Sequence, residues 1–131
     1  RSKAKTMLDP TVSRRFNHKS GPASVIDPDA LDIVFTNDRE AQQLVLKKFV
    51  AQMDEIFAEV ETALEESDIE RVRFNTHKLK SSARTVGANS LADLCVALEA
   101  ATHSTNWAEI DGLFDNLKPI ADSVKDYVNA F

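Results

Sequence analysis

The feature that most restricts the fold is a series of apolar residues that recur every three or four positions over about seven helical turns. The series follows Asn37, which is expected to cap the helix, and consists of Leu44, Val45, Phe49, Met53, Ile56, Val60 and Leu64. This spacing places the apolar side chains on one face of a long helix, and such a face must be covered by other elements. The chain is therefore expected to build a helical core.

A second helical segment, residues 68–86, carries a signal at each end. Ser67 and Glu70 form a Ser-x-x-Glu capping box at its start, and Gly87 suits the left-handed conformation that commonly ends a helix. The apolar seam of this segment is narrow and consists of Ile69, Val72, Thr76, Leu79, Ala83 and Val86. Both ends of the helix can thus be placed from the sequence.

Three further segments complete the chain. Asp27 before Pro28 predicts the start of a short lid helix, and Ser90 and Asn106 each open another helix. Pro119 interrupts the last one and is expected to kink it without splitting it. Because the connections between the four longer helices are short, the sequence predicts an all-α fold: an antiparallel up-down four-helix bundle with a short extra N-terminal helix.

Charge divides the chain into two parts. Residues 1–24 hold six Lys/Arg and one Asp, which leaves ten Lys/Arg and twenty Asp/Glu for residues 25–131, or net charges of +5 and −10. The first part has no sustained apolar period and is predicted to be a flexible basic linker before one domain; a basic arm touching lipid or nucleic acid is the alternative. The acidic domain argues against nucleic acid as a ligand.

His77 lies about 130° from the centre of the apolar seam on a helical wheel and therefore points outward. Its helical neighbours are Arg73, Phe74, Lys80, Ser81 and Arg84. A neutral imidazole has a lone pair that can attack phosphorus, and Lys80 at i+3 places a cation near the ring. Taken alone, however, an exposed histidine among cations is more often a solvated surface residue.

The stretch His77-Lys78-Leu79-Lys80-Ser81-Ser82-Ala83 resembles the His-x-Leu-Lys-Gly-Ser/Ala-Ala signature of histidine-containing phosphotransfer (HPt) domains. The similarity extends over about residues 25–131 and includes positions that look like the family's following helix, namely Gly87-Ala88, Leu91, Leu94-Cys95 and Leu98-Glu99. One position departs from the signature, because Ser81 stands where the family usually has a glycine that leaves room beside the histidine. Serine is also small.

The resemblance implies a phosphorelay intermediate of two-component signal transduction. His77 would accept a phosphoryl group from a receiver-domain aspartate and pass it to a response regulator, and Lys80 would stabilise the phosphoryl group. Phe74, Ser81 and Arg84 are expected to contact the receiver. No cofactor is expected on the chain itself, since Mg²⁺ belongs to the receiver, and no kinase activity is expected, since a Gly-rich phosphate loop is missing.

The resemblance also carries expectations about the whole protein. The chain starts at Arg1 and has no apolar run near 18 residues, so neither a signal peptide nor direct membrane insertion is expected. We expect a monomeric, cytoplasmic domain. Its basic start suggests the C-terminal module of a hybrid sensor histidine kinase, which would itself sit in the inner membrane.

Three other functions can be compared with the sequence. A helical adaptor that binds a signalling partner and is never phosphorylated is the main alternative, and it would keep its activity in a His77→Gln variant. A small hydrolase would need an activated nucleophile with a base and an orienting group, which the sequence lacks. A metal site at His18, His77 and His103 has neither ligand spacing nor a carboxylate partner.

Overall fold

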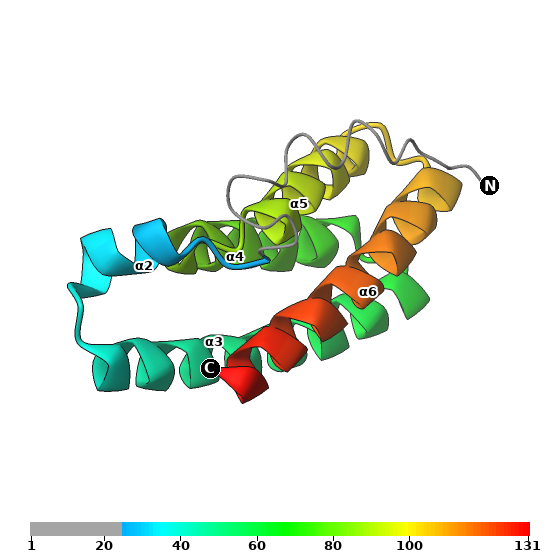
Figure 1. The fold of residues 1–131 in the computed structure, drawn as a ribbon. Helices are drawn as coiled ribbons and strands as arrows, with labels where there is room; N and C mark the ends of the chain where they lie inside the picture. Colours follow the sequence, from blue (N-terminus) through cyan, green and yellow to red (C-terminus); the bar gives the residue numbers. More distant parts are fainter. Residues whose placement is uncertain (1–24) are drawn as a thin grey trace, which may run out of the picture.

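The structure, a computed structural model, describes residues 25–131, which form five helices and no strand. These are α2 (Pro28–Phe35), α3 (Arg39–Glu65), α4 (Ile69–Val86), α5 (Asn89–Thr102) and α6 (Trp107–Ala130). Helices α3 to α6 form an antiparallel four-helix bundle to which α2 adds a short extra helix (Figure 1). The predicted fold class is confirmed. The predicted linker, residues 1–24, lies outside the described residues.

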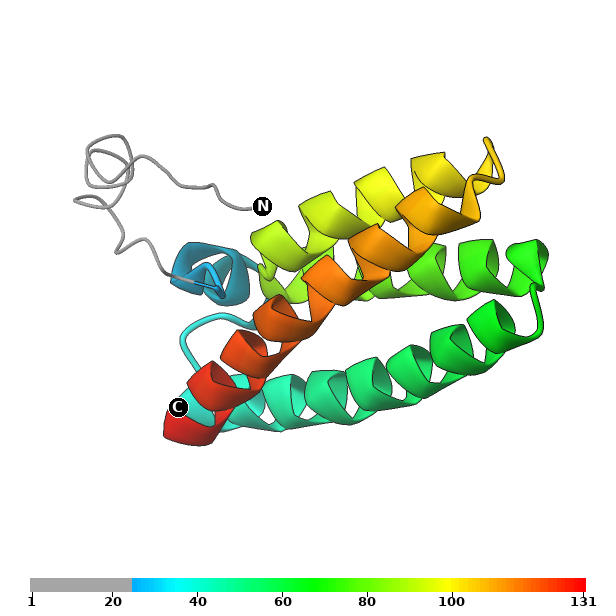
Figure 2. The same cartoon turned by 90° about the vertical axis from the view of Figure 1, so that its right-hand side faces the viewer.

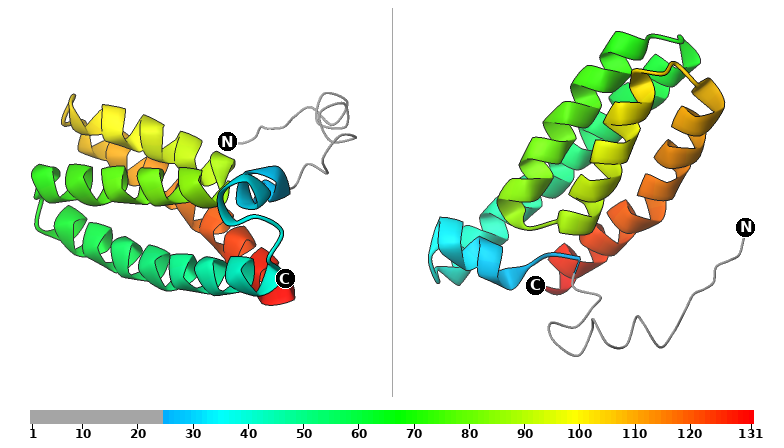
Figure 3. Two further views of the ribbon diagram at one scale, coloured as in Figure 1. Left: turned by 90° about the vertical axis from the view of Figure 1, so that its left-hand side faces the viewer. Right: turned by 90° about the horizontal axis from the view of Figure 1, so that it is seen from above.

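Consecutive helices of the bundle pack side by side, and α6 closes the bundle by packing on α3. Figure 2 shows α6 running back along α3, so that the last residue lies near the first turn of α3. There the Arg39 guanidinium donates a 2.9 Å hydrogen bond from Nη2 to the Phe131 carbonyl and lies 3.8 Å from the centre of the Phe131 ring. Helix α2 covers the end of the bundle where α4 turns into α5 (Figure 3).

The core follows the predicted apolar positions, with one exception. The exception is Leu44, which is 58% exposed. The inward positions of α3 pass instead through Gln42 and Leu46, and Leu44 lies two residues from each, about 200° around the helix. The remaining buried side chains of α3 are Phe49, Met53, Ile56, Val60 and Ala63.

Gln42 is a polar residue at a core position because it fastens α2 to α3. Its side-chain amide donates to the Asp32 carboxylate at 2.9 Å and to the Thr36 carbonyl at 2.7 Å. The residue is only 6% exposed, and these two hydrogen bonds satisfy its buried amide. The short helix is held at this end by side-chain hydrogen bonds and at its other end by the backbone bond from the Asp27 amide to the Gly87 carbonyl, at 2.9 Å.

Several helix boundaries lie where the sequence predicted them. The Asp27 carboxylate accepts the Asp29 amide at 3.0 Å, and the Asn106 side chain accepts the Glu109 amide at 3.1 Å. Gly87 ends α4 in the left-handed region with φ of 82°. Pro119 lies inside one continuous α6, as predicted, and the kink at this position stays a prediction.

Three predicted helix starts are wrong by one or two residues: the caps are Asp38, Asp68 and Ala88 in place of Asn37, Ser67 and Ser90. Ser67 cannot cap α4 because its backbone turns through the left-handed region (φ 53°) to connect α3 to α4. Asp68, one residue later, accepts the Arg71 amide at 3.2 Å. Spacing alone does not distinguish two adjacent residues that can both cap.

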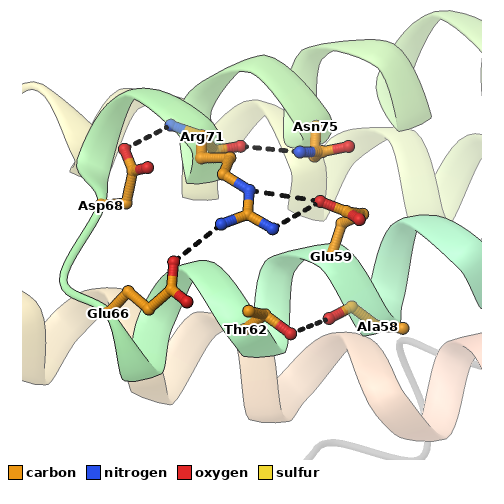
Figure 4. A network of polar contacts seen from close by, with 7 residues as sticks. All are labelled: Ala58, Glu59, Thr62, Glu66, Asp68, Arg71 and Asn75. Atoms are coloured by element: carbon orange, nitrogen blue, oxygen red, sulfur yellow. Dashed lines mark hydrogen bonds and ion pairs between the residues drawn. The ribbon is translucent and has the colours of Figure 1, made fainter.

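Arg71 joins the ends of α3 and α4 (Figure 4). By helical spacing it lies on a different face of α4 from His77. Its guanidinium donates to the Glu59 carboxylate from Nη2 at 2.9 Å and to the Glu66 carboxylate from Nη1 at 2.8 Å. The hydrogen bond with Glu59 is the main cause that raises the pKa of Arg71 above its ordinary value. The network fixes the connection that leads into α4.

Cys95, the only cysteine, is fully buried in the core. Burial raises the pKa of its thiol to about 12, so the thiolate is scarce at neutral pH. We expect the native chain to resist alkylation by iodoacetamide at about pH 8 and the unfolded chain to take up one label per molecule. Intact mass checks this, and rapid labelling of the native chain at the rate of a free thiol would contradict the buried position.

Candidate functional site

One carboxylate, that of Glu99 on α5, binds both side chains predicted to carry the chemistry. The Nδ1 atom of His77 lies 3.1 Å from Oε2 of Glu99. The Nζ atom of Lys80, one turn further along α4, donates to Oε1 of Glu99 at 2.7 Å. The imidazole, the ammonium group and the carboxylate therefore form a single cluster across the α4–α5 interface.

The contact with Glu99 determines which nitrogen of His77 is free to react. An ionised carboxylate only accepts hydrogen bonds, so the neutral ring that pairs with it carries its proton on Nδ1 and its lone pair on Nε2. The His77 side chain is 58% exposed, and within residues 25–131 no group forms a hydrogen bond with Nε2. In its neutral form the ring therefore offers an accessible nitrogen nucleophile.

Glu99 remains ionised because its partners favour the charged form. The hydrogen bond from Lys80 is the main cause that lowers the pKa of Glu99; burial opposes it, and the hydrogen bond from His77 adds to it. With a lowered pKa in the folded state, the carboxylate stabilises the fold at pH values above its ordinary pKa, and this contribution is lost as the pH falls through the lowered value. The cluster is therefore charged at neutral pH.

Arg73 aligns the two helices one turn before His77. Its Nε and Nη2 atoms donate to the side chain and carbonyl of Thr102 at 3.0 and 3.1 Å, and its Nη1 atom pairs with Glu70 at 2.9 Å. Thr102 in turn donates from Oγ1 to the Glu99 carbonyl. Arg73 thus acts at this site by holding the α5 end that carries Glu99.

The other predicted site residues lie on the exposed face of α4. Phe74 is 65% exposed, with the Lys78 ammonium 5.3 Å from its ring centre, and Ser81 is exposed one turn after His77. A groove of about 670 Å³ between α3 and α4 runs beside Phe74. Arg84 is also exposed but is about 10 Å from His77 along the helix axis, so it lies outside the cluster.

Glu99 is the site residue that sequence analysis did not identify. It is the only charged residue in the last nine positions of α5, 94–102. His77 and Glu99 each lie eleven residues from Ala88 (88 − 77 = 11 and 99 − 88 = 11), so a tight antiparallel turn at Gly87–Ala88 brings them face to face. This symmetry is the signal that could have revealed the pair.

Comparison with known proteins settles the family. Residues 44–129, about two thirds of the chain, match the Hpt domain family. The chain belongs to this family. The match leaves out α2 and includes α4 to α6 and most of α3. It confirms the family predicted from the sequence and, with it, the predicted class of function, a phosphorelay intermediate of two-component signalling.

Two individual proteins resemble this Hpt domain. The phosphorelay intermediate protein YPD1 of Candida albicans is 23% identical over 104 residues, which are 77% of this chain and 55% of YPD1, so the chain spans about half the length of that relative. The crystal structure of histidine-containing phosphotransfer protein B (HptB) from Pseudomonas aeruginosa PAO1 matches with a TM-score of 0.77 at 20% identity. The structural match covers 82% of this chain and 94% of HptB, and it supports the helical-bundle fold.

Hpt phosphorelay proteins interact with receiver domains of response regulators, which is the partner class predicted for this Hpt domain. In the part of the chain that the structure describes, no helix has both the length and the apolar character needed to cross a bilayer. No three His, Cys, Asp or Glu side chains among residues 25–131 lie close enough together to hold a metal ion. Membership in a hybrid sensor kinase stays a prediction.

Proposed function

We propose that this Hpt domain carries a phosphoryl group on Nε2 of His77 between the aspartates of two receiver domains. The observation that supports this most strongly is the contact between Nδ1 and Glu99, since in the neutral ring it leaves the lone pair on Nε2 of a side chain that is 58% exposed. Lys80, three residues after His77 on α4, binds the same Glu99 carboxylate as the ring does. An exposed nucleophile beside a cation, without any catalytic base, suits an acceptor whose partner supplies the remaining chemistry.

The transfer step requires only the groups described and those of a receiver. The Nε2 lone pair attacks phosphorus of the aspartyl phosphate, the N–P bond forms, and the P–O bond breaks with its electrons moving to the aspartate carboxylate. Lys80 turns its Nζ atom from Glu99 toward the phosphoryl oxygens. In the onward step another receiver aspartate attacks phosphorus, and the N–P electrons return to Nε2. Mg²⁺ is supplied by the receiver, and this Hpt domain needs no cofactor.

The exposed surface around His77 fits a transient partner. Phe74 offers an apolar contact on one side of the ring, and Ser81 offers a small side chain on the other. The domain works as a monomer in this proposal, because each transfer brings one receiver to one histidine. A relay between receiver domains places it in the cytoplasm.

The test is uptake of phosphate from a receiver domain that has been phosphorylated by a small-molecule donor in the presence of Mg²⁺. Intact mass should show one phosphoryl group on the chain, and the label should be labile in acid and stable in base, as expected of a phosphohistidine. A folded, helical chain that gained no mass from any of a panel of receivers would contradict the proposal and favour a non-phosphorylated adaptor.

A Phe74→Asp variant is expected to slow transfer from the receiver at least tenfold with an unchanged fold, because it places a charge in an apolar contact (about 1.4 kcal/mol or more). Leu44→Asp is the matched control, since Leu44 is similarly exposed but lies on the first turns of α3, remote from His77. Single-turnover transfer measures both variants. Equal transfer rates for Phe74→Asp and the wild type would show that Phe74 is not part of the docking surface.

A further inference from the structure

The side chain of Ser81 lies exposed on α4, one helical turn after His77. The two residues are four positions apart, and this spacing places their Cβ atoms about 6 Å from each other on the helix surface. Side chains on a helix lean toward its N-terminus, so the Ser81 side chain covers the turn that carries the His77 ring. A small hydrogen-bond donor therefore stands beside the nucleophile.

The hydroxyl of Ser81 is available to bind a ligand. A serine or threonine hydroxyl inside a helix can donate to the backbone carbonyl four residues earlier. Three hydroxyls in this protein do so at 3.1 Å, those of Thr62, Thr85 and Ser123. The Ser81 hydroxyl makes no such bond and has no other hydrogen-bond partner among residues 25–131.

The contact of His77 with Glu99 directs Nε2 to the part of the surface where Ser81 lies. Nδ1 faces α5, so the opposite edge of the ring faces away from that helix. Around α4, Lys80 lies about 60° from His77 on the side of α5, and Ser81 lies about 40° away on the other side. A phosphoryl group on Nε2 would thus be flanked by the Lys80 ammonium group and the Ser81 hydroxyl.

We propose that the Ser81 hydroxyl donates a hydrogen bond to a phosphoryl oxygen on Nε2 of His77 and thereby stabilises the phosphorylated chain. The inference rests on the proposed function and assigns Ser81 as a phosphoryl-binding residue. A glycine, which the signature of the family usually has at this position, supplies no side-chain donor. The hydroxyl keeps its proton throughout, and no bond to its oxygen forms or breaks.

The consequence is a transfer equilibrium displaced toward this chain. The phosphoryl group distributes between the receiver aspartate and His77 according to the free energies of the two phosphorylated forms. A hydrogen bond to a charged acceptor is stronger than one between neutral groups, and this one exists only while the phosphoryl group is on His77. Its free energy therefore favours phosphorylated His77 over the phosphorylated receiver.

The test compares the wild type with Ser81→Ala, which removes the hydroxyl and favours the helix. Single-turnover transfer is measured in both directions with the same Mg²⁺-bound receiver, and the ratio of the two rates gives the equilibrium constant. Ser81→Ala should shift this constant roughly fivefold to tenfold toward the phosphorylated receiver. The matched control is Ser82→Ala, since Ser82 lines the groove between α3 and α4 and should leave the constant unchanged.

A second measurement does not need a receiver. After treatment with phosphoramidate, ³¹P NMR follows the last ionisation of the phosphoryl group on His77 in each chain. A donor favours the more highly charged phosphoryl group, so this ionisation should occur at lower pH in the wild type than in Ser81→Ala.

Three results would count against these assignments. Equal equilibrium constants and equal ³¹P titrations for the wild type and Ser81→Ala would overturn the inference and leave the proposed function intact. A constant shifted toward the phosphorylated Ser81→Ala chain would also overturn it, because the serine would then only obstruct the phosphoryl group. If the wild type gained no phosphoryl group from any receiver, the proposed function would fall, and the inference with it.

Discussion

A His77→Gln variant is expected to fold as the wild-type chain does and to accept no phosphoryl group from a phosphorylated receiver. The side chain is 58% exposed and its one described contact is with Glu99, so its replacement leaves the core intact. The lone pair of an amide nitrogen is delocalised and cannot act as the nucleophile that an imidazole provides. Intact mass after incubation with the phosphorylated receiver should show no gain, and circular dichroism should show the wild-type helix content.

His103→Gln is the matched control for this experiment. His103 is exposed at the C-terminal end of α5 and lies outside the Glu99 cluster, so its replacement should leave phosphorylation unchanged. A His77→Gln chain that still gained an acid-labile phosphoryl group would show that another residue is the acceptor. The assignment of His77 would then be wrong even though the family is right.

Gly87→Ala is expected to cause the largest loss of stability of any small substitution in the turn between α4 and α5. Gly87 has φ of 82°, and an added Cβ would come within 2.8 Å of the Asp27 carbonyl oxygen and 3.0 Å of the Ala30 Cβ atom. The left-handed conformation costs roughly 1–2 kcal/mol for a residue with a side chain, and the clash with α2 adds about 1–3 kcal/mol. We expect the free energy of unfolding to fall by about 2–4 kcal/mol in denaturant titrations.

Gly112→Ala is expected to have the opposite effect on the free energy of unfolding. Gly112 lies inside α6, and a Cβ added there would meet no atom within 4 Å. Because alanine favours a helix interior over glycine, this variant should gain about 0.5–1 kcal/mol. A loss of only about 1–2 kcal/mol in Gly87→Ala would mean that the contact of α2 with the Gly87 turn does not exist in solution, and equal effects of the two substitutions would contradict the left-handed conformation of Gly87 as well.

The sequence predicted the bundle well because its helices follow one rule, the burial of a periodic apolar face. The seam of α4 lies in the core or packs against it, as predicted. Leu44 shows the limit of that rule, since an apolar residue can fit the spacing and still remain in solvent while Gln42 takes an inward position. Gln42 is buried because α2 and the residue that follows it supply partners for its amide. These tertiary contacts cannot be predicted from the periodicity of the sequence.

The predictions of helix caps were wrong for a similar reason. Ser67 and Asp68 both have capping side chains, and the choice between them depends on how α3 turns into α4. The turn places Ser67 in the left-handed region and leaves Asp68 to accept the Arg71 amide. A local motif therefore located the helix start to within one residue, and the geometry of the turn determined which residue caps the helix.

The candidate site was predictable on one helix only. Four of its residues lie on α4, where the helical period and a family signature place them: His77, Lys80, Phe74 and Ser81. Glu99 comes from α5, and no spacing rule within one helix relates it to His77 or Lys80. Its contact depends on the register between two helices, which the Gly87 turn and the Arg73–Thr102 hydrogen bonds establish.

The most direct test of the central claim is a relay with two receivers followed by ³¹P NMR. Phosphorylated receiver and Mg²⁺ are mixed with the wild-type chain, and an excess of a second, unphosphorylated receiver is added afterwards. We expect a signal of phosphohistidine at Nε2 that appears in the first step and decays in the second as aspartyl phosphate forms on the new receiver. A phosphoryl group that never reaches His77, or that stays on it when each of a panel of second receivers is offered, would contradict the assignment of this chain as a carrier.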